Sequence, residues 1–220
     1  MSSADGAPGA LRIFVTGTDT GVGKTVVSAA LALGLDGYYW KPVQAGTEPT
    51  TDTAQVRTWT GLPANRFIPE AYVLKEPMSP HAAARLEGIE IDVSRILRTS
   101  LPTDRPLVVE GAGGILVPLT SSQFVADLIA GLGGRAVLVA RAGLGTINHT
   151  LLSLEALARR SIPVLGVVMN GPSHESNRKA IEEYGRVPII GSVTPCAVID
   201  TTQLRIIFDR IRLYDTQAPR

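Results

Sequence analysis

Residue types that bind phosphate groups are concentrated in the segment 17–25, which reads Gly-Thr-Asp-Thr-Gly-Val-Gly-Lys-Thr. Glycines let a backbone curl around phosphate oxygens, and the N–H groups at the start of a following helix face the anion. We expect Lys24 to neutralise the β- and γ-phosphates of a nucleotide and Thr25 to place its hydroxyl on a magnesium ion. The interval from Gly17 to Gly23 is one residue longer than in the common pattern G-x-x-x-x-G-K-[ST]. A turn that needs glycine for steric reasons alone is the alternative, but Gly-Lys-Thr lies where phosphate binding requires it.

Two carboxylates are candidates to share that magnesium ion. Glu110 ends the apolar run Leu-Val-Val and is followed by Gly-Ala-Gly-Gly. A strand-terminal acid of this kind accompanies phosphate-binding loops and holds magnesium directly or through water. The alternative is a carboxylate that caps the following turn. Asp52 lies at the expected start of a helix, where a plain N-cap is an equal alternative, so its assignment as a metal ligand depends on Thr25 and Glu110.

A second lysine, Lys41, ends the aromatic run Tyr-Tyr-Trp at 38–40. Pro42 and Gly46 predict a rigid turn after it, which would aim Lys41 over the phosphates. A cation there stabilises charge on a transferring phosphoryl group. A terminal charge that simply reaches solvent is the alternative.

These residues need elements that position them, and the apolar runs predict such elements. Strands are expected at 11–16, 38–42, 106–110, 136–140, 164–169 and 189–191. Helices are expected at 24–35, 51–60, 80–86, 93–100, 124–132, 146–160, 176–184 and 201–213. Most of the strands lack polar alternation, which favours an α/β fold with a mostly parallel sheet sandwiched between helices. Ligands of such sheets bind beyond the carboxyl ends of the strands, where the candidate residues lie.

Composition sets the class of protein. The 220 residues are 45% hydrophobic and 19% charged, which is typical of a globular chain. We expect one domain over residues 1–220, with loose ends at 1–10 and 216–220. A net charge of +1 favours neither nucleic acid nor a membrane as partner. No secretory signal begins the chain, and the single cysteine, Cys196, excludes an intramolecular disulfide, so we expect a cytoplasmic enzyme.

Six blocks of sequence carry a family resemblance. They are Val-Thr-Gly-Thr-Asp-Thr at 15–20, Val-Gly-Lys-Thr at 22–25, Lys-Pro-Val at 41–43, Ser-Pro-His at 79–81, Val-Glu-Gly-Ala-Gly-Gly at 109–114 and Gly-Leu-Gly-Thr-Ile-Asn-His at 143–149. Together they resemble the dethiobiotin synthase family, in order from about residue 11 to about residue 171. The extra residue in the phosphate loop is itself a mark of that family.

The resemblance implies a P-loop NTPase-like fold and an ATP-dependent ring closure. The family's substrate is 7,8-diaminopelargonate, one of whose amines takes up CO2, supplied as bicarbonate, to form a carbamate. The carbamate attacks the γ-phosphate of MgATP and gives a carbamic–phosphoric anhydride. The second amine then displaces phosphate and closes the cyclic urea of dethiobiotin, a step in biotin biosynthesis. Such a site must hold two anions together, which requires concentrated positive charge.

The resemblance also assigns roles residue by residue. Lys24 and Lys41 match the catalytic lysines. The magnesium ligands match Thr25, Asp52 and Glu110, and the other ATP-binding residues match Thr20, Gly21, Val22, Gly23 and Asn170. Asn170 matches the residue that recognises adenine, although an Asx turn closing a strand is an equal alternative. Substrate-binding positions match Lys41, Ala45, Gly113, Gly145, Thr146, Ile147 and Asn148. The last four form a helix start that binds the substrate carboxylate from the partner subunit of a homodimer with shared sites.

Three departures from the family pattern stand out. Ala45 occupies a position where the family often has Ser or Thr, so this chain lacks a hydroxyl near the carbamate. We expect Gln44 or Thr47 to make that contact instead. The segment 24–41 is short, which predicts a first helix trimmed by a turn or more. The segment 191–196 lacks the usual Gly-Glu-Ile-Pro-like ending, so contacts to the nucleotide base are not transferred there.

Two other classes of protein remain open at this point. A cobyrinate-type amide-forming synthetase shares the fold and the loop style, but such proteins carry a glutaminase domain for which this chain has no room. A partitioning-type nucleotide-switch ATPase places a second lysine near the start of the loop, where this chain has Thr18 and Asp19. A switch ATPase would respond to a protein or DNA partner rather than to a diamine.

Overall fold

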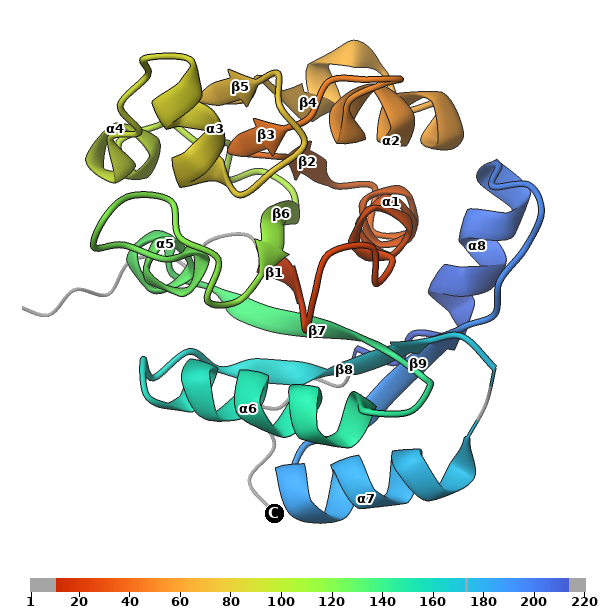
Figure 1. Cartoon of the computed structure of the whole chain (residues 1–220). Coiled ribbons are helices and arrows are strands. Elements are labelled where there is room, and N and C mark those ends of the chain that lie inside the picture. Colours follow the sequence, from red (N-terminus) through yellow and green to blue (C-terminus); the bar gives the residue numbers. More distant parts are fainter. Residues whose placement is uncertain (1–10, 173, 214–220) are drawn as a thin grey trace, which may run out of the picture.

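A seven-stranded parallel sheet forms the centre of the computed structural model, which describes residues 11–172 and 174–213 (Figure 1). Its strands are β1 (Arg12–Gly17), β2 (Tyr38–Trp40), β4 (Phe67–Ile68), β6 (Leu107–Gly114), β7 (Arg135–Arg141), β8 (Val164–Asn170) and β9 (Ile189–Val193). They lie in the order β4-β2-β6-β1-β7-β8-β9, and every neighbouring pair is parallel. The expected α/β fold is therefore confirmed. The expected loose ends, 1–10 and 216–220, fall outside these ranges in whole.

Helices cover both faces of the sheet because the inner strands are apolar on both faces (Figure 1). On one face Ile13 and Val15 pack in a core with α1 (Lys24–Gly34), α2 (Asp52–Thr60) and α8 (Thr201–Asp209). On the other face Phe14 packs in a core with α4 (Val93–Leu97), α5 (Val125–Leu132) and α6 (Thr146–Ala158). Helix α7 (Glu175–Gly185) adds Ile181 to a third core that holds Leu138 of β7. Successive residues of a strand thus face opposite helix layers.

A second, two-stranded sheet lies beside the main one and was not predicted. Its parallel strands are β3 (Val43–Ala45) and β5 (Tyr72–Leu74), next to α3 (Pro80–Leu86). The edge strand β4 and the 3-10 helix η1 (Ala64–Arg66) were also not predicted. Segments of two or three residues are too short to show a period in the sequence, so pairing with distant residues determines them.

The ends of the expected elements differ from the prediction for identifiable reasons. All six expected strands and all eight expected helices occur in the described residues. Strand β2 ends at Trp40 rather than at Pro42, since proline has no N–H to donate to a neighbouring strand. Strand β6 continues past Glu110 to Gly114, and its register with β1 shifts after Val15. The extra residues in β6 form a bulge beside the phosphate-binding loop.

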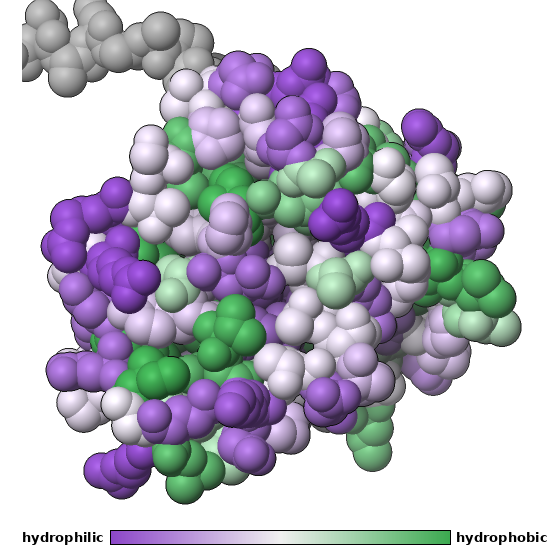
Figure 2. All heavy atoms as spheres, turned by 90° about the horizontal axis from the view of Figure 1, so that it is seen from above, coloured by the Kyte–Doolittle hydropathy of each residue, from purple (hydrophilic) through white to green (hydrophobic). Residues whose placement is uncertain are grey.

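The surface above α2, α3 and α4 is mixed in character (Figure 2). Hydrophilic residues separate small apolar groups there. Leu86 and Val73, from α3 and β5, are 67% and 46% exposed. Single exposed apolar side chains of this kind are normal on protein surfaces. Among the described helices, none combines the length and apolarity needed to cross a membrane.

Candidate active site

The loop between β1 and α1 has the backbone that phosphate binding needs. Helix α1 begins at Lys24, and its N-cap, Gly23, has a left-handed φ of 97°. A Cβ atom on Gly23 would lie 2.3 Å from Nδ2 of Asn170, so no other residue fits there without movement. Gly21 also has a positive φ, 71°. The glycines therefore turn the chain back so that the start of α1 opens toward a cavity.

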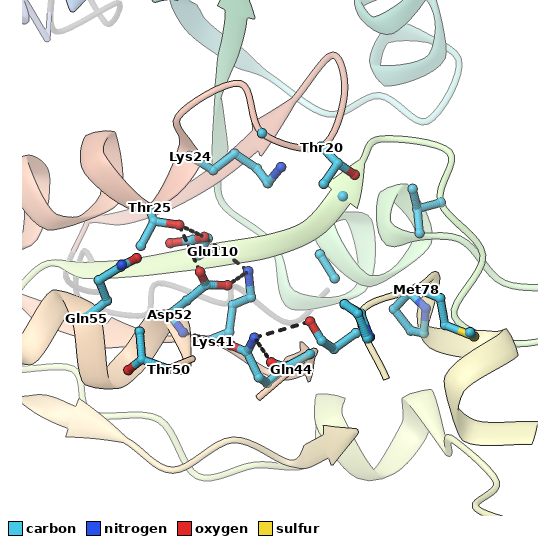
Figure 3. Close-up of a pocket in the computed structure, with 18 of the residues that line it drawn as sticks. Thr20, Lys24, Thr25, Lys41, Gln44, Thr50, Asp52, Gln55, Met78 and Glu110 are labelled. Atoms are coloured by element: carbon cyan, nitrogen blue, oxygen red, sulfur yellow. Dashed lines mark hydrogen bonds and ion pairs between the residues drawn. The ribbon is translucent and has the colours of Figure 1, made fainter. Parts of the chain in front are cut away.

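A cavity of about 590 Å³ lies over this loop and the carboxyl ends of β2 and β6 (Figure 3). It brings together most of the residues singled out from the sequence. Those that line it are Thr20, Gly21, Gly23, Lys24, Thr25, Lys41, Ala45, Asp52, Glu110 and Gly113. The carboxyl ends of the strands thus form the site, as expected for a parallel sheet.

Thr25, Asp52 and Glu110 converge although they are far apart in sequence (Figure 3). The Thr25 hydroxyl donates to Oε1 of Glu110 at 2.9 Å, and the distance from the same hydroxyl oxygen to Oδ1 of Asp52 is 3.1 Å. Three oxygen-bearing side chains in contact suit magnesium, which prefers oxygen ligands and keeps several waters. In residues 11–172 and 174–213, no three or more His, Cys, Asp and Glu side chains come together to hold a metal ion. The present site would instead combine two carboxylates with the Thr25 hydroxyl.

Lys41 lies against both carboxylates. Its Nζ is 2.7 Å from Oδ2 of Asp52 and 3.1 Å from Oε1 of Glu110, and it donates to the carbonyl of Gly111 at 3.1 Å. The side chain is 4% exposed, so the alternative of a strand-end charge in solvent is wrong. Burial lowers the pKa of Lys41, but attraction to Glu110 and Asp52 outweighs it and raises the pKa overall. For Asp52, burial raises the pKa, and Lys41 more than reverses this and holds it below its usual value.

Lys24 extends from the loop above this cluster (Figure 3). Its Nζ donates to the backbone carbonyl of Asp19 at 3.0 Å, and the residue is 7% exposed. Burial, followed by repulsion from Lys41, lowers the pKa of Lys24 to about 8. The carboxylate of Asp19 pairs with Arg141 at the end of β7, which ties the loop to the neighbouring strand.

Asp52 is not the N-cap of α2. Thr51 takes that position, and its Oγ1 accepts the N–H of Ala54 at 3.2 Å. The carboxylate of Asp52 is therefore free to turn into the cavity, while its N–H donates to Oε1 of Gln44 at 3.1 Å. The Gln44 amide also donates to the carbonyls of Ala45 and Gly46. Gln44 lines the cavity but its amide is bound to the backbone, whereas Thr47 does not line the cavity, so a replacement for the hydroxyl missing at Ala45 stays a prediction.

Sequence reasoning missed Tyr39 as a member of the site. Its hydroxyl donates to Oε2 of Glu110 at 3.0 Å, and Tyr39 is fully buried. Burial, then the nearby Glu110, raises the pKa of Tyr39 well above its usual value, so the hydroxyl keeps its proton. The available signal was its place two residues before Lys41 in the expected strand 38–42, because residues i and i+2 of a strand share a face.

Asn170 and Val22 lie beside the cavity rather than in its lining. Asn170 ends β8, and its Nδ2 donates to the Val22 carbonyl at 2.9 Å. The side chain therefore contacts the phosphate-binding loop from the side of β8. A role for Asn170 in recognising adenine stays a prediction.

The four expected carboxylate-binding residues lie at the start of α6. Gly145 is the N-cap with a φ of 88°, and Thr146 begins the helix. Gly145 and Asn148 are exposed, whereas Thr146 is buried. None of these residues, nor Ile147, lines the cavity described above within the same subunit.

A second cavity of about 390 Å³ lies between α6 and the loop. It is lined by Thr18, Asp19, Thr20, Gly114, Ile115, Leu116, Val117, His149, Leu152 and Ser153. Thr20 and Val117 line both cavities, so the two are adjacent. His149, which follows Asn148 in α6, lines this second cavity. The start of α6 therefore lies next to a cavity that adjoins the phosphate-binding loop.

Comparison with known proteins gives a consistent family. A family model described as an AAA domain matches residues 11–203. The chain is 50% identical over 198 residues to an ATP-dependent dethiobiotin synthetase BioD of Rhodopseudomonas palustris (strain BisA53), covering 90% of this chain and 92% of that protein. A protein of the same name from Nitrobacter hamburgensis is 50% identical over 197 residues. The bifunctional biotin biosynthesis protein BioCD of Bordetella avium is 52% identical over 190 residues. The match covers 86% of this chain and 40% of that longer protein.

Solved structures support the fold. The septum site-determining protein MinD of Pyrococcus horikoshii, solved with Mg-ADP, superposes with a TM-score of 0.54 at 14% identity and covers 95% of this chain and 90% of that one. Chloroplast FtsY of Physcomitrella patens gives 0.52 at 14% identity over 96% of this chain and 64% of that one. At these identities the likeness concerns the fold alone.

Proposed function

This chain belongs to the ATP-dependent dethiobiotin synthetase family, and from that premise we propose that it closes the urea ring of dethiobiotin. The substrates are 7,8-diaminopelargonate, CO2, which is in equilibrium with bicarbonate, and ATP. The observation that carries the proposal is one cavity in which a phosphate-binding loop faces Lys24, Lys41 and two carboxylates. We further propose that residues 1–220 act as one domain and that the enzyme works in the cytoplasm, where ATP is available.

Magnesium is the metal ion that this site would take. Thr25, Asp52 and Glu110 would hold it, because their oxygens already contact one another. When bound, the ion would neutralise charge on the β- and γ-phosphates. The protein supplies the ligands on three separate elements, so the site depends on the fold rather than on one segment.

The two lysines carry the remaining positive charge. Lys24, at the start of α1, would lie along the phosphates together with Thr20, Gly21, Val22 and Gly23. Lys41 would contact the carbamate and the transferring phosphoryl group from the opposite wall, near Ala45 and Gly113. Two cations and a helix start concentrate positive charge where carbamate and triphosphate must approach each other. Asn170, beside the loop, would recognise adenine.

We propose that the enzyme is a homodimer whose sites are shared. Leu144 is fully exposed, and Leu116 and Leu152 are 49% and 56% exposed, around the second cavity and the start of α6. Burying such side chains against a second subunit stabilises association. The start of α6, where Gly145 and Asn148 are exposed, would then bind the substrate carboxylate in the partner's site through residues 145–148.

Mass spectrometry tests the function directly. The full chain is incubated with 7,8-diaminopelargonate, bicarbonate and MgATP, and the products are searched for dethiobiotin. Formation of dethiobiotin with one ADP per turnover is the expected result. A rate of ATP hydrolysis that does not change with the diamine but rises with DNA or a protein partner would instead indicate a switch ATPase.

Replacing Lys24 by Ala should lower turnover by two orders of magnitude or more. A preorganised charge-stabilising group contributes roughly 3–4 kcal/mol to a barrier. Circular dichroism should show an intact fold. Near-normal turnover of Lys24→Ala would remove this lysine from the proposed chemistry.

A further inference from the structure

We propose that Tyr39 is a positioning residue for Glu110: the Tyr39 hydroxyl binds one carboxylate oxygen of Glu110 and so holds the carboxylate in the orientation in which its other oxygen faces the metal site. The inference rests on the proposed function only in that Glu110 is taken as a metal ligand. Tyr39 would contact neither nucleotide nor diamine, so it acts through Glu110 alone.

The pairing of β2 with β6 places the two residues together. Tyr39 lies opposite Val108, and Trp40 lies opposite Val109, so Glu110 is the diagonal neighbour of Tyr39 on the same face. Tyr39 and Val108 belong to the core under α1, while Trp40 and Val109 belong to the core on the other side. The tyrosine side chain thus runs along the sheet beneath α1 and reaches Glu110 from within.

The two oxygens of Glu110 have different partners. Oε1 faces the cavity side and contacts the Thr25 hydroxyl at 2.9 Å and Nζ of Lys41 at 3.1 Å. Oε2 accepts the Tyr39 hydroxyl at 3.0 Å. Glu110 is 1% exposed and Tyr39 is fully buried, so water cannot replace this donor without reorganisation. Removing the hydroxyl leaves Oε2 unpaired and frees the carboxylate to rotate away from its present orientation.

The hydroxyl can be tested apart from the ring. The Tyr39 ring fills the core and lies 6.1 Å from the Phe67 ring, centroid to centroid. Tyr39→Phe keeps that packing and removes only the donor. The neighbouring Tyr38 offers a matched control, because its hydroxyl contacts the exposed Asp104 at 3.1 Å. Tyr38→Phe therefore removes the same group one residue away, outside the site.

Metal binding is the measurement that separates a positioning role from a structural one. Mn²⁺, detected by electron paramagnetic resonance, serves as the probe in the presence of a non-hydrolysable ATP analogue. Outer partners of metal ligands typically change metal affinity by about 10- to 100-fold when removed. We expect Tyr39→Phe to weaken Mn²⁺ binding by roughly that factor, with Tyr38→Phe within about twofold of the wild type.

A double-mutant cycle tests whether Tyr39 acts through Glu110. In a Glu110→Gln background, Tyr39→Phe should weaken Mn²⁺ binding little further, because the group it orients is already lost. An equal, additive loss in both backgrounds would overturn the proposal. Unchanged Mn²⁺ affinity in Tyr39→Phe alone would overturn it as well.

Tyr39→Leu tests whether reduced stability of the fold, rather than loss of the hydroxyl, weakens Mn²⁺ binding. It should lower the unfolding midpoint further than Tyr39→Phe, because it removes ring packing from the core, but should weaken Mn²⁺ binding by the same factor. Metal affinity that follows the unfolding midpoint across the two variants would make Tyr39 a structural residue only. None of these readouts needs the diamine, so a wild-type protein that forms no dethiobiotin refutes the proposed function and leaves the Tyr39 result to be read separately.

Discussion

Lys41 and Glu110 are charged residues buried so far from solvent that either charge without a partner would destabilise the fold. They are 4% and 1% exposed, and they contact each other at 3.1 Å. A buried charge is tolerated when it is paired and hydrogen-bonded, and removing one partner leaves the other uncompensated. Lys41 therefore balances, in the free protein, the two carboxylates proposed to bind magnesium.

Replacing Lys41 by Ala should destabilise the metal-free protein by about 3–5 kcal/mol, the usual cost of breaking a buried ion pair. Mg²⁺ should offset part of this loss, because a divalent cation can take over both carboxylates. Thermal unfolding with and without Mg²⁺ measures both effects.

Lys179→Ala is the control for that experiment. Lys179 forms an exposed pair with Glu175 at 3.8 Å, whose loss should cost less than about 1 kcal/mol with or without Mg²⁺. A Lys41→Ala protein as stable as the wild type would contradict the account of a balanced cluster.

The lowered pKa of Lys24 predicts a pH dependence of stability. The folded chain releases this proton near pH 8, whereas the unfolded chain holds it up to the ordinary value of 10.5. The unfolded state binds more protons between those values, so the free energy of unfolding rises with pH across that window. Below pH 8 the cost of burying the charge is fully present, at most about 3 kcal/mol.

Urea unfolding at pH 7 and pH 9 checks this prediction. The wild type should gain about 1 kcal/mol relative to Lys24→Met between the two pH values. The comparison with Lys24→Met cancels contributions from other titrating groups. A difference between wild type and variant that stays constant with pH would mean that Lys24 titrates normally.

At the scale of elements, the phosphate-binding loop depends on two glycines in different surroundings. Gly21 has a φ of 71° and nothing within 4 Å of the place where a Cβ would lie. Gly23 has a φ of 97°, and a Cβ there would meet the Asn170 amide at 2.3 Å. Both positions are strained for other residues by roughly 1–2 kcal/mol, but only Gly23 also contacts a side chain.

Gly23→Ala should therefore cost more stability than Gly21→Ala, by about 1 kcal/mol or more. The added methyl group displaces the Asn170 amide from the Val22 carbonyl and breaks that hydrogen bond. ATP affinity should also fall further in Gly23→Ala than in Gly21→Ala, because only the first substitution displaces a neighbouring side chain of the loop. Equal losses in the two variants would show that backbone strain alone determines the effect.

At the scale of the whole molecule, the two adjacent cavities and the exposed start of α6 favour a shared site. The phosphate-binding loop lies between the cavities, and Gly145 to Asn148 lie outside the first one. A second subunit related by a two-fold axis would bring its own helix start to this place. This arrangement predicts that two inactive variants can complement each other.

Lys24→Ala lacks phosphate chemistry but keeps its helix start, whereas Gly145→Leu loses the helix start but keeps its phosphates. A Cβ atom at Gly145 would meet nothing within 4 Å in its own subunit, although the φ of 88° adds strain. After exchange, half of the dimers are hybrid, and each hybrid has one intact site. About a quarter of all sites should then be active, as measured by dethiobiotin formation.

Native mass spectrometry confirms the exchange, and a freshly mixed sample that has not exchanged is the control. Complete exchange without recovered activity would mean that each subunit binds its substrate alone. That result would leave the phosphate chemistry unaffected, since the two substitutions act on separate functions.

Features that depend on contiguous residues are the ones that the amino-acid sequence predicts. The loop at 17–25, the start of α1 and the apolar strands depend on neighbours in the chain, so their pattern predicts them. The parallel sheet follows from strands that are apolar on both faces. The motifs around Thr25, Asp52 and Glu110 make each a candidate ligand of one magnesium ion, and the family resemblance assigns all three to that ion.

Contacts between distant segments required the tertiary structure. The register of β2 against β6 decides that Tyr39 reaches Oε2 of Glu110 and that Lys41 lies against Oε1. The short strands β3 and β5 exist only because they pair with each other. Such contacts arise from burial and hydrogen bonding across long loops, and no local pattern encodes which oxygen meets which donor.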